Sequence, residues 1–89
     1  MFEWDDEKNQ RNLCKHGVDF SDVIPVFSDP YAITREDKDH SEDRFVTIGQ
    51  GKYLMVVVVA YAHRTETFRI ISARRATKNE RKYYDRQKK

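Results

Sequence analysis

One long apolar run stands out from an otherwise polar chain, at residues 53–62 (Tyr-Leu-Met-Val-Val-Val-Val-Ala-Tyr-Ala). Its four consecutive valines are β-branched and favour an extended backbone. The run lacks polar alternation, so we expect a strand with both faces covered. It is too short for a membrane helix, which needs about 20 apolar residues. A buried helix segment is the alternative, because short apolar runs are ambiguous by pattern alone. We predict the central strand of a small sheet here.

Shorter segments with alternating apolar and polar positions predict the other strands. They lie at residues 2–4, 31–35, 44–50 and 67–74. The strands at 31–35, 44–50, 53–62 and 67–74 follow one another along the chain and are separated only by polar stretches. Consecutive strands joined by short turns pair in antiparallel fashion, so we expect an antiparallel meander.

Three helices are predicted from their end signals. Asp5 or Asp6 caps the first helix, and Gly17 ends it in a left-handed conformation. A second, short helix with an apolar face covers residues 21–27 and stops at Ser28-Asp29-Pro30. Thr77 followed by Glu80 is a capping-box pattern that opens the last helix, 77–86. The resulting order, β-α-α-β-β-β-β-α, predicts one α+β domain over residues 1–89 with a small antiparallel sheet.

The charge is distributed unevenly along the chain. Residues 1–43 hold five Lys/Arg and twelve Asp/Glu, a net charge of −7, whereas residues 44–89 hold twelve and three, a net charge of +9. Such a split indicates a polyanion-binding half, a site for an acidic partner, or both. Mutual neutralisation of the two halves across the fold is the plainer explanation.

Composition and motifs exclude several classes of protein. The single cysteine, Cys14, excludes an internal disulfide and a Cys-rich zinc site. The N-terminus lacks a basic and then apolar leader, so a cytoplasmic protein without a membrane segment is expected. Nucleotide-binding glycine loops and metalloprotease motifs are absent from the sequence. The acidic residues near position 40 are more typical of a solvated loop than of a magnesium site, so no metal or cofactor is predicted.

Two polar segments carry candidate chemistry. His40 lies among carboxylates that favour its charged form, and Arg44 opens the next strand. A histidine that titrates near neutrality can act as an acid or a base. The alternative is a surface histidine in a loop.

The second segment is the strand that contains Arg69, Arg74 and Arg75. Strict alternation places Phe68, Ile70, Ser72 and Arg74 on one face, and Arg69, Ile71, Ala73 and Arg75 on the other. Guanidinium groups bind phosphate through paired hydrogen bonds and stabilise a charged transition state. An Arg–Glu surface network is the alternative. The last helix adds basic side chains that suit an RNA backbone, while its two tyrosines are expected to pack on the sheet.

The polar segments together resemble the BrnT-type toxins of bacterial type II toxin–antitoxin pairs. The resemblance spans nearly the whole chain. It rests on Phe2-Glu3-Trp4-Asp5, Lys15-His16-Gly17-Val18, Val26-Phe27-Ser28-Asp29-Pro30, Asp39-His40-Ser41-Glu42 and Arg69-Ile70-Ile71-Ser72-Ala73-Arg74-Arg75-Ala76-Thr77. It implies a RelE-like fold and a ribonuclease that arrests translation. It also implies a BrnA-like ribbon-helix-helix antitoxin and contact with operator DNA only through the antitoxin complex.

The reaction we expect on this basis is metal-independent RNA cleavage. A base removes the proton of the ribose 2′-OH, which attacks the adjacent phosphate, and arginines stabilise the added charge. His40 is the expected acid or base. The expected phosphate ligands are Arg44, Arg74 and Arg75, and the weaker candidates for substrate binding are Arg69, Lys15, Lys78 and Arg81. The alternative function is a non-catalytic module that blocks translation or acts as a co-repressor with its antitoxin.

Overall fold

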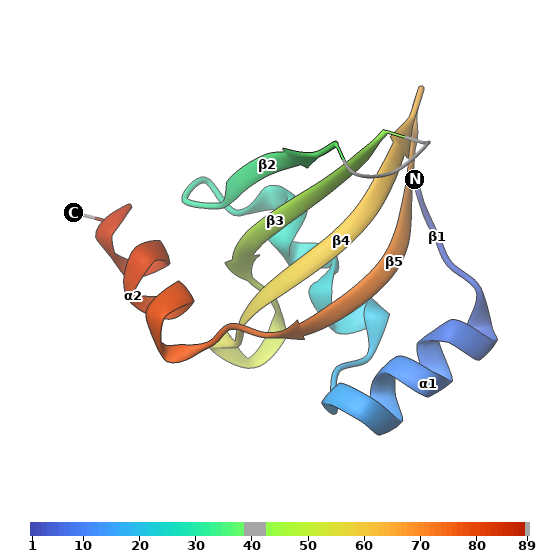
Figure 1. Ribbon diagram of the computed structural model, residues 1–89, viewed down its shortest axis with the longest axis horizontal. Coiled ribbons are helices and arrows are strands. Elements are labelled where there is room, and N and C mark those ends of the chain that lie inside the picture. Colours follow the sequence, from blue (N-terminus) through green and yellow to red (C-terminus); the bar gives the residue numbers. More distant parts are fainter. Residues whose placement is uncertain (39–42, 89) are drawn as a thin grey trace.

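A computed structural model describes residues 1–38 and 43–88, which form an α+β fold around a five-stranded sheet in the order β1-β5-β4-β3-β2 (Figure 1). The strand rich in valine, β4, lies in the middle of this sheet, as predicted. The elements in chain order are β1 (Phe2–Glu3), α1 (Asp6–His16), the 3-10 helix η1 (Phe20–Ser28), β2 (Ile33–Asp37), β3 (Arg44–Gln50), the 3-10 turn η2 (Lys52–Leu54), β4 (Val56–Arg64), β5 (Thr67–Arg75) and α2 (Lys78–Arg86).

The sheet is mixed, so the prediction of a purely antiparallel sheet is wrong. Strands β2 to β5 pair in antiparallel fashion, but β1 pairs with β5 in parallel. The reason is connectivity: β1 is followed by helices rather than by a hairpin turn, so nothing forces it to run against its neighbour. It occupies the edge of the sheet beside the last strand.

The hydrophobic core lies between the sheet and η1, which covers the rear face in Figure 1. Val57 and Val59 of β4 contact this cluster, as do Phe20 and Val23 of η1, and all four are fully buried. Burying a side chain of this kind stabilises the fold by about 1.5–3 kcal/mol. The second predicted helix therefore supplies the apolar face that was expected, but in 3-10 geometry.

Helix α1 is attached to the edge of β5 by the buried Asn12, and the buried Asn9 attaches it to the start of η1. Its N-cap is Asp5 and its C-cap is Gly17, at φ 70°, so both predicted end signals are confirmed. The side-chain amide of Asn12 donates to the carbonyl oxygens of Val18 and Ala73 and accepts from the Ala73 N–H. Asn12 thus pairs with β5 where β1 has ended, and fixes the C-terminal end of α1 beside the sheet.

Helix α2 is attached to the opposite part of the fold by one hydrogen-bonded carboxylate. The hydroxyl of Tyr84, which is 1 % exposed, donates to Asp29, and the same carboxylate accepts from the backbone N–H groups of Tyr31 and Gln50. Burial alone would raise the pKa of Asp29, but the hydrogen bonds from Tyr84 and the backbone outweigh it and lower this pKa. The position of α2 relative to β3 is therefore set by a polar contact.

The central strand begins later than predicted. Tyr53 and Leu54 have the sequence character of the strand but belong to η2, where both adopt positive φ, 60° and 57°. They are 83 % and 75 % exposed. The prediction failed here because apolar residues usually continue a buried strand, whereas this chain presents the first two of its apolar run to solvent.

Candidate functional site

A β-bulge in β5 decides which arginines share a face of the sheet. Across from it, Ala60 pairs with Ser72 and Tyr61 pairs with Ile70, so Ile71 is an extra residue. Strict alternation along the strand predicted that Arg69 and Arg74 lie on opposite faces. That prediction is wrong, because the bulge shifts the alternation of β5 by one residue. Both arginines consequently lie on the face away from η1.

This face is the open face of the sheet, and its floor is apolar. The register aligns Val58 with Ile48 on β3 and with Arg74 on β5, and it aligns Ala60 with Val46 and Ser72. In Figure 1 the helices α1 and α2 flank the lower part of the sheet and leave its front face open.

A hollow of about 740 Å³ lies on the open face between the two helices. Three of its lining side chains are positively charged: Lys15 comes from the last turn of α1, Arg35 from β2 and Arg74 from β5, and His16 lies beside Lys15. Tyr83 of α2 also lines it and is 48 % exposed. An open apolar floor with cationic walls and an exposed aromatic ring suits a single-stranded nucleic acid.

Arg74 is held in place by Glu80 of α2. Two parallel hydrogen bonds of 2.7 and 3.0 Å join the guanidinium to the carboxylate. The hydrogen bonds from Arg74 lower the pKa of Glu80 to about 2, and the same contact raises the pKa of Arg74. Glu80 also accepts from the Thr77 N–H and completes the predicted capping box. The Arg–Glu network expected as the alternative is therefore present at this position.

A second group of basic side chains lies at the other end of the open face. Ala62 pairs with both Arg44 and Arg69, and these arginines line a small hollow of about 140 Å³ with Asp5 and Lys8. Ala62 and Val58 are four residues apart on β4, about 13 Å at the rise of a strand. The structure therefore brings Arg44 and Arg69 together but separates them from Arg74.

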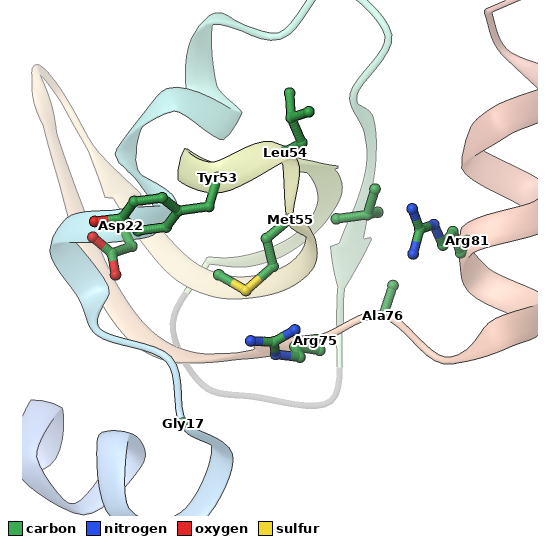
Figure 2. A pocket seen from close by; sticks show the side chains of 9 residues that line it. Gly17, Asp22, Tyr53, Leu54, Met55, Arg75, Ala76 and Arg81 are labelled. Atoms are coloured by element: carbon green, nitrogen blue, oxygen red, sulfur yellow. The ribbon is translucent and has the colours of Figure 1, made fainter.

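Arg75 and Arg81 belong to a third location, at the end of the sheet. They line a hollow of about 610 Å³ together with Tyr53, Leu54 and Met55. In Figure 2 Met55 lies between Tyr53 and Arg75, and Arg81 reaches in from α2. The five arginines and lysines predicted from β5 and α2 thus do not form one site, and Lys78 is exposed at the start of α2.

His40, the predicted acid or base, lies outside the described residues, as do the other members of the segment 39–42. Its role stays a prediction. Within residues 1–38 and 43–88, no group of three or more His, Cys, Asp and Glu side chains could hold a metal ion. Among the same residues, none of the helices has the length and apolar character needed to cross a bilayer.

Three residues of the open-face hollow were not predicted from the sequence. His16 was named only as part of the resemblance, Arg35 was assigned to a strand, and Tyr83 was expected to pack on the sheet. Only Tyr84 of the two tyrosines packs inside, with 1 % exposure. The signal for this site in the sequence was the adjacent pair Lys15 and His16 at a helix end. Their position beside β5 depends on the hydrogen bond from Asn12 to Ala73, which are 61 residues apart in the sequence.

The fold and the site together define a small α+β protein with a cation-lined sheet face that suits a polyanion. A family model described as the ribonuclease toxin BrnT of type II toxin–antitoxin systems matches residues 4–80. The chain therefore belongs to the BrnT family, as the resemblance predicted.

A solved structure supports this assignment. The chain is similar to the crystal structure of the Brucella abortus ribonuclease toxin BrnT, with 28 % identity and a TM-score of 0.68. The match covers 88 % of this chain and 99 % of the Brucella chain. None of the curated proteins compared matches the chain.

Proposed function

We propose that this protein is an endoribonuclease toxin that cleaves RNA at the open-face hollow, without a metal ion. The observation that carries the proposal is the convergence of Lys15, His16, Arg35 and Arg74 around an accessible apolar floor. Ammonium and guanidinium groups such as those of Lys15, Arg35 and Arg74 are poor ligands for a divalent metal but good partners for phosphate. The carboxylate among the described lining residues, Glu80, is already bonded to Arg74.

The proposed reaction begins at the ribose 2′-OH. Loss of its proton lets the 2′ oxygen attack the adjacent phosphorus, the bond from phosphorus to the 5′ oxygen breaks, and that oxygen takes up a proton. The products are a 2′,3′-cyclic phosphate and a 5′-hydroxyl. We assign one of the two proton transfers to His16, because an imidazole nitrogen can accept or donate a proton and this ring lines the hollow. Lys15 and Arg74 stabilise the charge that develops on the phosphate.

Tyr83 and Arg35 are proposed to hold the RNA beside the reacting phosphate. An exposed tyrosine offers a stacking surface for a base, and a guanidinium binds the backbone. The RelE-like fold and the arrest of translation that the resemblance implies are part of the same proposal. In the same proposal the toxin acts in the cytoplasm, a BrnA-like ribbon-helix-helix antitoxin neutralises it, and operator DNA is bound only through that antitoxin.

The reaction is tested with purified toxin and a defined RNA in excess EDTA. We expect cleavage, with 2′,3′-cyclic phosphate ends, and no cleavage of DNA of the same sequence, which lacks the 2′-OH. A strict requirement for Mg²⁺, or 3′-hydroxyl products, would contradict the proposed chemistry. Binding without cleavage would favour the non-catalytic module instead.

A further inference from the structure

The end of the sheet carries an exposed apolar surface that the proposed reaction does not use. It consists of Tyr53 and Leu54 of η2 with the neighbouring Met55, and Arg75 and Arg81 border it (Figure 2). Tyr53 and Leu54 are 83 % and 75 % exposed, whereas most large apolar side chains of the described residues are at least partly buried. We call these five residues the η2 surface.

The backbone at the η2 surface is strained in a way that keeps the side chains exposed. Two consecutive residues with a Cβ adopt the left-handed region, which costs roughly 1–2 kcal/mol for each. Glycine or asparagine would adopt it more easily. Exposed tyrosine and leucine at such positions contribute little to the core, so their presence points to contact with another molecule.

The turn that carries the η2 surface is closed by a hydrogen bond and packs tightly on η1. The Gly51 N–H donates to the Met55 carbonyl at 2.8 Å and closes the turn. Gly51 itself packs against η1 so closely that a Cβ there would lie 2.5 Å from the Asp22 carbonyl oxygen. A surface fixed in this way loses little conformational freedom when a partner binds.

The positive charge of the η2 surface indicates a partner that carries negative charge. Asp22 lies beside Lys52, at 3.9 Å, so its charge is locally compensated. Among residues 1–38 and 43–88, the guanidinium groups of Arg75 and Arg81 enter no ion pair with the chain itself and are exposed. A partner that fits would place apolar side chains on Tyr53 and Leu54 and carboxylates beside the two arginines.

We propose that the η2 surface docks an acidic, amphipathic segment of the antitoxin. This inference rests on the proposed function, since a type II toxin acts with a protein antitoxin. Tyrosine and arginine are enriched among residues that dominate protein–protein binding, and an exposed leucine beside them has no stacking partner to gain from RNA. The open-face hollow shares none of the five residues of the η2 surface, so each can be changed without altering a residue of the other.

The test is the affinity of the purified cognate antitoxin for a Tyr53→Asn/Leu54→Asn variant. Asparagine is tolerated at positive φ, so the variant is expected to fold. We expect antitoxin binding to weaken at least about 100-fold, because each hot-spot side chain is worth about 30-fold. Tyr31→Asn, which removes a tyrosine that is 44 % exposed beside another hollow, is the matched control and keeps its affinity within a factor of about three.

A second arm separates the antitoxin from RNA. The same variants are titrated with a 2′-O-methyl oligonucleotide, which binds but is not cleaved, and free-toxin cleavage is measured. For the Tyr53/Leu54 variant we expect the oligonucleotide affinity and the cleavage rate to equal those of wild type. Arg81→Glu is expected to weaken antitoxin binding and to reduce the dependence of this affinity on salt. Unchanged antitoxin affinity, or a loss confined to the oligonucleotide, would overturn the inference. A wild-type toxin that fails to cleave RNA would refute the proposed function but leave the antitoxin-binding result valid.

Discussion

Glu80→Gln removes a charge from the contact that fixes Arg74, and its effect on stability can be worked out from the structure. The pKa of Glu80 falls from 4.5 to about 2, through the hydrogen bonds from Arg74. A shift of one unit corresponds to about 1.36 kcal/mol, which sets an upper limit near 3.4 kcal/mol. The Arg74 side chain is 42 % exposed, so solvent screening reduces the expected loss at pH 7 to about 1–2 kcal/mol. Glutamine still fits the capping box, so the change mainly reports the charge.

The sign of the pH dependence follows from the direction of the shift. A carboxyl group with a lowered folded-state pKa contributes stability above its unfolded pKa and loses it as the pH falls through the folded value. The difference in free energy of unfolding between wild type and Glu80→Gln should therefore be constant above about pH 5.5 and shrink between 4.5 and about 2.

Urea denaturation at a series of pH values measures this difference directly. Other carboxylates, such as Asp29, titrate in both proteins and cancel. Glu36→Gln on β2 is the control, because Glu36 is exposed and its side chain forms no ion pair with residues 1–38 and 43–88. A gap that is equally large at pH 3 and pH 7, or absent at both, would refute the assignment of this contact as a stabilising ion pair.

Three further outcomes follow from the fold and the site. Asn12→Ala should lower the free energy of unfolding by about 2–3 kcal/mol in urea, since it removes three buried hydrogen bonds and leaves backbone groups of β5 unpaired. Leu54→Asn should instead raise it by about 0.5–1 kcal/mol, because it relieves strain at an exposed position with φ 57°. Binding of a 2′-O-methyl oligonucleotide should weaken with salt at a logarithmic slope near −2, as about three cations line the open-face hollow.

Local signals in the sequence were sufficient for the ends of the helices and for the middle of the sheet. Asp5 and Gly17 act as caps through contacts within a few residues, and the valine run is buried by its own composition. Such features depend on neighbouring residues or on apolar character alone, which a sequence displays.

Features that depend on distant contacts were not predictable. The bulge at Ile71 changes which arginines share a face, yet alternation gives no sign of it. The parallel pairing of β1 depends on how the helices return the chain. Lys15 and His16 reach the open face only because Asn12 binds β5. The site predicted from the sequence was centred on His40, whereas the site proposed from the structure lies at the end of α1. Arg74 belongs to both the predicted and the proposed site.

The most direct test of the account compares three histidine variants in RNA cleavage. We expect His16→Ala to lower kcat at least about 100-fold, while its affinity for a 2′-O-methyl oligonucleotide stays within a few-fold of wild type. His63→Ala, an exposed histidine stacked on Phe68 at 4.3 Å between ring centroids, should cleave like wild type. Wild-type cleavage by His16→Ala, with the loss found in His40→Ala instead, would contradict a catalytic site at the open-face hollow.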